Sequence, residues 1–368
     1  MTEQEAYVAF NLAERVGSVT VEKLVSRYGS VAAAWENFPK KVARNGGEID
    51  WQLEFSIAAK YHVTILTPAD ADYPEILRKT QGHPLVLYVM GDVAALSKAA
   101  IAIVGTRRAT AYGCDQANRF GYELAGNGWC IVSGLALGVD AEAHRGALDA
   151  GGVTVAVLGS ALDRLYPEEN RELAREIVRK GGAVVSEFPF GREPDNQTFP
   201  QRNHVVAALA SGVLAVEAPS KSGTLITVGF ATTLGRTCMA VPGRVDSPSS
   251  AGCLKLIRDG VTLVRCAADV QEAMSNLLPP SGRKVEKEDT ALSNPVAKKS
   301  PIVVEPPKFS LEESMIMREV DAVGVSMDHL VGCTGLSESK VATLCMTLRL
   351  KGRLRYLPGN RVALPRQP

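Results

Sequence analysis

The sequence predicts an α/β protein with a Rossmann-like, doubly wound and mostly parallel sheet at its centre. Short apolar runs alternate with helical stretches between about residues 66 and 275. Runs that are apolar on both faces are typical of parallel strands covered by helices on both sides. The alternation of strand and helix is typical of doubly wound folds. The predicted strands are 101–104, 129–132, 153–158, 183–186, 213–216, 238–241 and 261–264, with helices such as 116–124, 141–148 and 171–179 between them.

Residues 1–65 predict a small helical module of the SAM or helix-hairpin-helix type. Apolar residues from Ala9 to Val16 have helical spacing, and Gly17 is expected to stop that helix. Thr20 is expected to cap a second helix and Ser30 a third. The module therefore precedes the Rossmann-like domain, residues 66–275.

Two further segments follow this domain. Residues 276–308 are rich in proline, serine and charge, which indicates a flexible linker. Residues 309–368 predict three helices, with Ser326 and Ser337 as caps of the second and third. A Pro-Gly-Asn turn between two short apolar runs then predicts a hairpin. This order of elements is typical of a winged helix.

Composition excludes several classes of protein. The net charge is +1, so any contact with nucleic acid must come from a local basic patch. The N-terminus lacks the pattern of a signal peptide, and no apolar run approaches the roughly 20 residues of a membrane span. The seven cysteines form no C-x-x-C pair, so neither a metal site nor a disulfide framework is expected. We expect a cytoplasmic protein without a membrane segment.

Small and hydroxylic residues follow four of the predicted strands. The loops read Gly-Thr-Arg-Arg at 105–108, Ser-Gly at 133–134, Gly-Ser at 159–160 and Lys-Ser-Gly-Thr at 221–224. Ligands of open parallel sheets bind at the carboxyl ends of the strands, and helix N-termini there bind anions. Glycine is also common in turns without any ligand. The recurrence of these loops, with two arginines, favours contact with phosphate.

Known nucleotide fingerprints are absent. Residues 105–110 read G-T-R-R-A-T instead of G-x-G-x-x-G, and no G-x-x-x-x-G-K-[ST] occurs. We therefore expect no cofactor. A further basic group, Arg202, stands in the segment Phe-Pro-Gln-Arg-Asn at 199–203.

Several ordered motifs resemble the DNA-processing protein A (DprA, or Smf) family. They are IVGTRRATAYG (103–113), IVSGLALGVDAEAHRGAL (131–148), TVAVLGSALDRLYPEENREL (154–173), SEFPFG (186–191), FPQRN (199–203), SGTLITVGFA (222–231) and VPG (241–243). The resemblance covers nearly the whole predicted α/β domain. The flanking segments also look like accessory domains of this family.

The resemblance implies a Rossmann-like homodimer that binds single-stranded DNA, protects incoming DNA and loads the recombinase RecA onto it during natural transformation. It implies that Arg107 contacts DNA and that Arg171 supplies a basic group near the same pocket. His204 departs from the family, which usually has arginine there. The expected DNA- or phosphate-binding residues are Gly105, Thr106, Arg107, Arg108, Ser133, Gly134, Arg171, Arg202, Asn203, Lys221, Ser222, Gly223 and Thr224.

An enzyme on the same fold is the alternative. The loops also resemble those of phosphoribohydrolases with the motif P-G-G-x-G-T-x-x-E, but Thr227 stands at the acidic position. Threonine cannot act as the general acid or base of such a reaction, which favours binding without catalysis. Asp140, Glu142 and His144 suggest a metal site, yet a cap formed by Asp140 is the more common role. Likewise, Glu187 and Glu217 are expected to bond loop amides.

Aromatic and basic residues supply the remaining candidates. Bases of a single strand stack on aromatic side chains, and Phe188 and Phe190 are the preferred candidates over Tyr112, Tyr166 and Phe199. The predicted winged helix is basic from residue 338 onward. Lys340, Arg349, Lys351, Arg353, Arg355, Arg361 and Arg366 stand there against Glu338. Auxiliary nucleic-acid binding and protein docking are both open for this unit.

Overall fold

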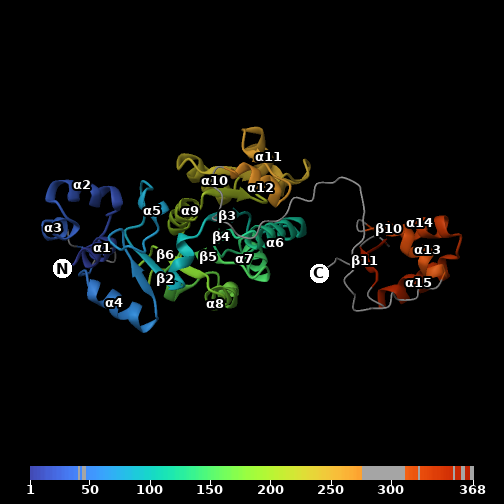
Figure 1. Cartoon of the computed structure of the whole chain (residues 1–368), viewed down its shortest axis with the longest axis horizontal. Helices are drawn as coiled ribbons and strands as arrows, with labels where there is room; N and C mark the ends of the chain where they lie inside the picture. Colours follow the sequence, from blue (N-terminus) through green and yellow to red (C-terminus); the bar gives the residue numbers. More distant parts are fainter. Residues whose placement is uncertain are drawn as a thin grey trace, which may run out of the picture. The chain divides into compact units, whose positions relative to one another are not determined.

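The computed structural model describes residues 1–39, 42–43, 47–275, 311–321, 324–350, 353–357 and 361–364. The chain forms two compact units, Met1–Lys287 and Glu288–Pro368 (Figure 1). The predicted linker, residues 276–308, lies outside the described residues. Within the described ranges, no helix has both the length and the apolar composition needed to cross a bilayer.

A nine-stranded sheet of described residues organises the first unit, in the order β1-β2-β6-β5-β4-β3-β7-β8-β9. Strands β3 to β9 run parallel to one another, which confirms the prediction of a mostly parallel sheet. Every residue of β3 to β7 is buried, as expected where helices cover both faces. The seven strands span Ala100–Val104, Cys130–Ser133, Thr154–Val157, Ala183–Ser186, Gly212–Ala215, Thr237–Ala240 and Thr262–Leu263.

The two edges of the sheet differ from the prediction. Both residues of β9 are exposed, because this short strand pairs only with β8. At the other edge, β1 (Thr64–Leu66) and β2 (Leu87–Gly91) run antiparallel, β2 against β6 and β1 against β2. This pair was not predicted, because only the short helix α5 (Glu75–Arg78) separates the two strands and the regular alternation with long helices is lost.

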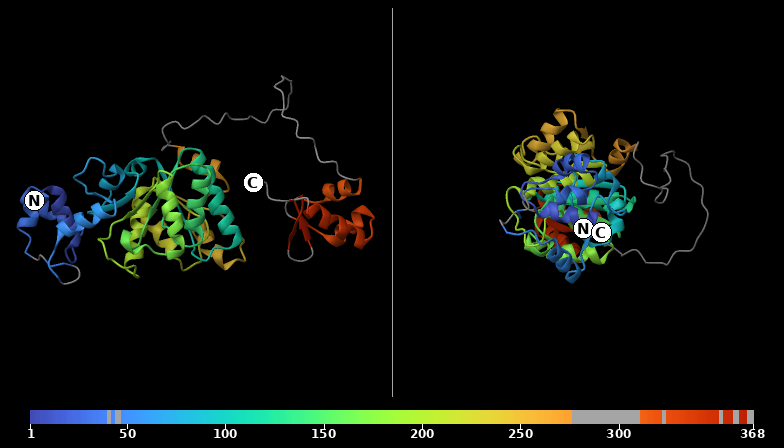
Figure 2. Two further views of the ribbon diagram at one scale, coloured as in Figure 1. Left: turned by 90° about the horizontal axis from the view of Figure 1, so that it is seen from below. Right: turned by 90° about the vertical axis from the view of Figure 1, so that its left-hand side faces the viewer.

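Helices form a layer on each face of the parallel strands. Ile101 and Ile103 of β3 pack against α6, α7 and α12. Ala102 and Val104, which alternate with them, pack against α9, α10 and α11. The left view of Figure 2 shows green helices of the first layer, with α8 beside them, in front of the strands. The helices are α6 (Ala111–Gly126), α7 (Val139–Asp149), α8 (Arg171–Arg179), α9 (Thr198–Leu209), α10 (Gly223–Thr233), α11 (Ala251–Arg258) and α12 (Ala267–Ala273).

Four N-terminal helices share the core of this unit. They are α1 (Glu3–Leu12), α2 (Ser18–Tyr28), α3 (Val31–Glu36) and α4 (Trp51–Lys60). Phe10 of α1 belongs to one apolar cluster with Tyr88 of β2 and Ile177 of α8. The Ser30 hydroxyl caps α3 as predicted, accepting from the Ala33 amide at 3.1 Å. The predicted Thr20 cap is wrong, because α2 already begins at Ser18 after Gly17.

The described residues of the second unit form three helices, as predicted, the two strands of the predicted hairpin and one additional strand, whereas the predicted turn at 358–360 lies outside the described residues. Its elements are α13 (Leu311–Glu319), β10 (Val325–Ser326), α14 (Met327–Thr334), α15 (Glu338–Leu350), β11 (Arg355–Leu357) and β12 (Arg361–Ala363). Both β10 and β11 pair antiparallel with β12. The Ser326 hydroxyl caps α14 as predicted, accepting from the His329 amide at 3.2 Å. Leu330, Val341 and Leu348 lie in its own apolar core.

Removal of residues 288–368 is expected to leave the first unit folded, because the apolar clusters of the two units have no member in common. Thermal unfolding of residues 1–287, followed by circular dichroism, should give one cooperative transition. A broad, gradual melt of the shortened chain would contradict this division.

Candidate phosphate-binding cleft

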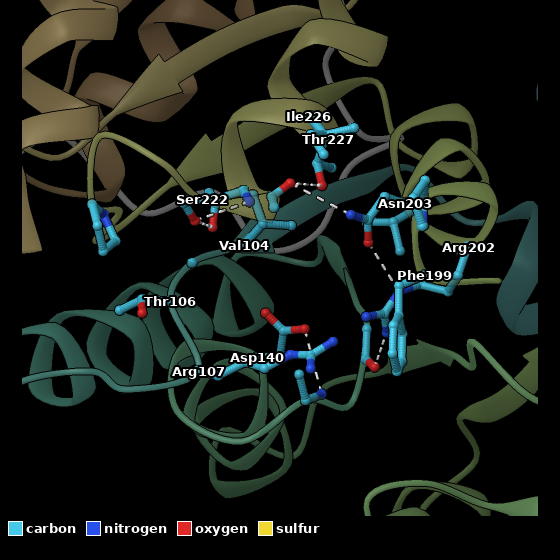
Figure 3. A pocket seen from close by; sticks show the side chains of 18 of the residues that line it. Val104, Thr106, Arg107, Asp140, Phe199, Arg202, Asn203, Ser222, Ile226 and Thr227 are labelled. Atoms are coloured by element: carbon cyan, nitrogen blue, oxygen red, sulfur yellow. Dashed lines mark hydrogen bonds between the residues drawn. The ribbon is translucent and has the colours of Figure 1, made fainter. Parts of the chain in front are cut away.

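The strand-end loops meet at a cleft where the order of the sheet reverses. Strand β3 pairs with β4 on one side and with β7 on the other, so the loops after β3 and β7 lead in opposite directions. Such a switch point opens a crevice at the carboxyl ends of the strands. A cleft of about 440 Å³ lies there (Figure 3). Its lining includes all but two of the expected residues: Gly105, Thr106, Arg107, Arg108, Gly134, Arg202, Asn203, Lys221, Ser222, Gly223 and Thr224.

The two exceptions are Ser133 and Arg171. Ser133 is fully buried at the end of β4, where its hydroxyl donates to the Ile103 carbonyl at 2.6 Å. Arg171 begins α8 and is exposed outside the cleft lining, where its Nε donates to Glu168 at 2.6 Å. The structure therefore does not place Ser133 in the cleft lining as expected, and Arg171, expected near the pocket, does not line it either. Ser133 already bonds the neighbouring strand, and Arg171 belongs to the connection between β5 and β6.

A buried carboxylate anchors the loop after β3. Glu217, directly after β7, accepts from the Thr110 amide and from the Thr110 hydroxyl, both at 2.8 Å. The Glu217 carbonyl accepts from the Thr106 amide at 2.7 Å. These bonds confirm the expected structural role of Glu217 and join the two strand-end loops across the switch point. Arg107 and Arg108 are consequently presented on an anchored loop, with both side chains exposed.

The opposite wall of the cleft is the N-terminus of α10. The Ser222 hydroxyl caps the helix by accepting from the Thr224 amide at 3.1 Å. The Leu225 amide bonds the Ser222 carbonyl at 3.1 Å, and the positive end of the helix dipole at this terminus favours a bound anion. Asn203 connects this wall to α9, because its Nδ2 donates to the Gly223 carbonyl at 3.4 Å. Lys221 is exposed next to the cap.

Aromatic rings support Arg107. Its guanidinium carbon lies 4.5 Å from the centre of the Phe199 ring, a cation–π distance. The centre of the Tyr166 ring is a further 6.1 Å from that of Phe199, and Tyr166 is 47% exposed. The preference for Phe188 and Phe190 as stacking platforms is wrong. Phe188 is buried, and Phe190 packs against Tyr88 with ring centres 5.2 Å apart.

Arg202 forms the floor of the cleft. Its side chain is 95% buried, and Nη1 donates to the carbonyls of Gly134 and of Val157, the latter at 3.0 Å. Nη2 forms no hydrogen bond with the described residues, although the group lines the cleft. Burial lowers the pKa of Arg202, and the nearby Asp140 opposes this effect. Arg202 therefore braces two strand ends and leaves one donor nitrogen without a protein partner.

Glycine is required where Arg202 meets the loop after β4. A Cβ on Gly134 would lie 2.1 Å from Arg202 Nη1 and 2.8 Å from Asp140 Oδ2. Gly138 has a φ of +78°, and a Cβ there would lie 2.5 Å from the Thr106 carbonyl oxygen. The glycines of this motif allow three loops to approach closely at the switch point.

Asp140 is the only carboxylate among the described residues of the cleft lining. It is buried, and burial raises its pKa, while Arg202 and the Ala136 amide oppose this effect. The prediction that Asp140 caps α7 is wrong, because the N-cap residue of this helix is Gly138. Asp140 instead accepts from the Ala136 amide at 3.4 Å and so holds the loop after β4.

His144 forms a hydrogen bond with a residue of β5 and, within the described part of the chain, not with a second potential metal ligand. Its Nδ1 lies 2.7 Å from the hydroxyl of Thr154, and that hydroxyl donates to the Ile131 carbonyl at 2.6 Å. Because the hydroxyl has one proton, which goes to the Ile131 carbonyl, Nδ1 of His144 is the donor in the other bond. Burial lowers the pKa of His144 to about 3.

This low pKa predicts destabilisation by acid. The unfolded chain binds a proton at His144 below about pH 6.5, while the folded chain does not until about pH 3, so stability present above pH 6.5 is lost as the pH falls. Between pH 6.5 and 5 the loss is about 2 kcal/mol for this group. Urea unfolding should show a flatter pH dependence for His144→Met than for the unsubstituted chain. Equal slopes for the two proteins would contradict the neutral, buried ring.

One group of potential metal ligands lies among the described residues, in the second unit. Glu319, His329 and Cys333 are exposed, and their donor atoms lie within 4.8 Å of one another. The cysteine spacing alone predicts no metal site. Three donors are one fewer than a closed structural zinc site uses.

Fold and cleft together define a Rossmann-like protein with a cleft lined by arginine and lysine side chains at the switch point of its sheet. The chain belongs to the DNA recombination-mediator protein A family, whose sequence model matches residues 64–275. The protein Smf of Synechocystis is 30% identical over 98% of both chains. The protein Smf of Escherichia coli is 34% identical over 82% of this chain and 78% of its own. The DNA processing protein DprA of Bacillus subtilis is 39% identical over 55% of this chain and 68% of its own.

Two solved structures agree with this assignment. DprA from Streptococcus pneumoniae covers 74% of this chain and 98% of its own, with a TM-score of 0.62 and 29% identity. DNA processing protein A from Helicobacter pylori covers 59% of this chain and 98% of its own, with a TM-score of 0.53 and 29% identity. The structure of the latter is described in terms of its single-stranded DNA binding mode. Family and largely parallel α/β fold are thus confirmed.

Proposed function

We propose that this protein binds single-stranded DNA in the cleft, protects incoming DNA and loads RecA onto it in the cytoplasm during natural transformation. The observation that carries the binding step is the convergence of three kinds of donor on one cleft. They are the exposed arginines after β3, the first turn of α10 and the free nitrogen of Arg202. The single-stranded DNA binding described for the Helicobacter pylori relative supports the same ligand.

A phosphate backbone suits this arrangement better than a compact nucleotide. Guanidinium groups and helix N-termini bind phosphate without reading a base sequence. Arg107 and Arg108 are exposed at the rim, and no salt bridge joins either of them to a described carboxylate. Both groups can therefore meet successive phosphates of a chain that passes over the cleft.

Among its described lining residues, the cleft lacks a carboxylate that is free to act as a general acid or base, which favours binding without catalysis. Thr227 is buried in α10, and its hydroxyl donates to the Gly223 carbonyl at 3.4 Å. At the position of the carboxylate in the phosphoribohydrolase motif, this chain therefore has a hydroxyl that bonds a backbone carbonyl of its own helix. Asp140 is buried beside Arg202 and bonds its own loop, so it is not free to activate water. We infer that the protein is not an enzyme. Release of free base from nucleoside monophosphates by the purified protein would overturn this part of the proposal.

The experiment that tests binding is a fluorescence anisotropy titration with labelled oligothymidylate and with a duplex of equal length, at several salt concentrations. We expect a preference for the single strand. We also expect log K to fall linearly with log salt, with a slope of about −0.7 per phosphate contacted. A salt-independent affinity, or equal binding of both DNAs, would contradict the phosphate cleft proposed here.

The remaining assignments rest on the family. We propose that residues 66–275 form the DNA-binding domain and the homodimer interface, and that residues 1–65 form an accessory module. We also propose a winged helix for residues 309–368. Two arginines of this unit form hydrogen bonds with its backbone. Arg361 donates to the Gly324 carbonyl at 2.5 Å, and Arg355 donates to the Leu364 carbonyl at 3.1 Å. Sedimentation equilibrium tests whether the protein is a dimer. Strand-exchange assays with RecA, on single-stranded DNA already bound by this protein, test whether it loads RecA.

A further inference from the structure

Two further hollows continue from the cleft along α9 and α10. The cleft and the second hollow, of about 470 Å³, share Pro200. The second hollow and a third, of about 500 Å³, share His204 and Phe230. The three hollows therefore follow one another along the same pair of helices, beginning at the N-terminus of α10.

The residues that line this row have helical spacing. Gly223, Ile226, Phe230 and Thr233 lie on one face of α10, three or four positions apart, and line the hollows in that order. Ile226 is 46% exposed in a helix whose other apolar residues mostly face the sheet. From Ile226, which still lines the cleft, to Thr233, seven residues of helix extend about 10 Å. The face is thus long enough for more than one nucleotide beyond the cleft.

Two rings stand at the middle of the row. The rings of His204 and Phe230 meet edge to face, with centres 5.3 Å apart. Burial lowers the pKa of His204, so the ring is neutral near pH 7. Glu187 also lines this middle hollow. Neutral rings beside a carboxylate suit a stacked base and not a phosphate.

Positive charge returns at the far end. Arg236 and Lys79 line the third hollow, and no described carboxylate lines it. Arg236 Nη2 donates to the Ala208 carbonyl at 3.2 Å, while the buried Nε has no hydrogen-bond partner among the described residues. No described acid forms a salt bridge with Arg236, and its pKa is lowered by burial alone. Lys79 is 75% exposed and pairs with Glu75 at 3.4 Å.

We propose that this row is a second section of the strand path, which takes a base against His204 and Phe230 and the next phosphate at Lys79 and Arg236. The proposal rests on the proposed function, because it extends the path of the same single strand. It assigns an aromatic role to position 204, where the family's usual arginine is replaced by histidine. The alternation of cations, rings and cations matches the alternation of phosphate and base along a single strand.

The test compares the full-length protein with His204→Ala and Lys79→Glu on oligothymidylates of increasing length. The shortest oligonucleotide that binds should fill only the cleft, so both variants should match the unsubstituted protein there. On longer oligonucleotides we expect each variant to bind about 5-fold more weakly, the effect of one lost stacked base or one lost phosphate contact. A longer oligonucleotide can bind in more registers, which raises its apparent affinity for every protein. The affinity of each variant is therefore divided by that of the unsubstituted protein for the same oligonucleotide.

Further variants separate the roles. His204→Phe keeps a ring and should restore the affinity on long oligonucleotides, whereas Lys79→Glu should also reduce the salt slope by about 0.7. Lys98→Glu is the matched control, since this exposed lysine precedes β3 at the other end of the strand. If the variants bind oligothymidylate as tightly as the unsubstituted protein at every length, the second section of the strand path is overturned, while the proposed function is not. Failure of the unsubstituted protein to bind any length would overturn the proposed function.

Discussion

Replacement of Arg107 with glutamate is expected to weaken binding of single-stranded DNA about 100-fold at low salt, or about 2.7 kcal/mol. Arg107 is exposed on the anchored loop after β3, and its guanidinium lies over Phe199 with no salt bridge in the described structure to satisfy it. The substitution removes one attraction for phosphate and adds a repulsion. Fluorescence anisotropy with a labelled oligothymidylate measures the effect.

Arg171→Glu is the matched control for this experiment. Both arginines stand in motifs shared with the family, but Arg171 lies on α8 outside the cleft lining and pairs with Glu168. We expect its reversal to change the affinity by less than about 3-fold, since surface pairs and distant charges contribute little. Equal losses for both variants would mean that general charge, and not the cleft, determines binding.

Replacement of Arg202 with methionine is expected to destabilise the first unit by about 3 kcal/mol, a cost typical of a buried charge that loses its partner. The substitution leaves Asp140 buried without its neighbouring cation and leaves the Gly134 carbonyl without its donor. Urea unfolding followed by circular dichroism measures the change in the free energy of unfolding.

A second substitution tests the cause of this loss. Asp140→Asn combined with Arg202→Met removes the unpaired charge, so the double variant should recover part of the stability lost in Arg202→Met. Binding should remain weak in the double variant, because the nitrogen of Arg202 that faces the cleft is still missing. No recovery in the double variant would show that the strand-end carbonyls, and not Asp140, depend on Arg202.

Local sequence patterns were sufficient for the parallel strands. The runs around Ile101 and Val213 are apolar on both faces, and only strands covered by helices on both sides bury both faces. The edges were harder to predict, because an edge strand such as β9 has exposed residues and carries no such pattern. Caps were predicted where a hydroxyl stands directly before an apolar helix, as at Ser30, and missed where glycine precedes the helix, as at Gly17.

Which of the candidate residues share a cleft was only partly visible in the motifs. Arg107 and Thr224 were placed together because the carboxyl ends of parallel strands lie at one edge of the sheet. The same reasoning failed for Ser133, because the sequence does not show that its hydroxyl bonds the Ile103 carbonyl. Phe188 and Phe199 have similar local sequences, and only packing buries the first and places the second beneath Arg107.

The sequence by itself determined the α/β class, the family and the chemistry of the strand-end loops, because these depend on residue type and on spacing along the chain. Only the tertiary structure decided that Arg202 is a buried brace, that Arg171 lies outside the cleft and that His204 meets Phe230. The contacts of Arg202 and His204 join segments far apart in sequence, and the position of Arg171 depends on where α8 lies relative to the cleft. Such placements are set by how helices α8, α9 and α10 pack on the sheet, which no local pattern of residues encodes.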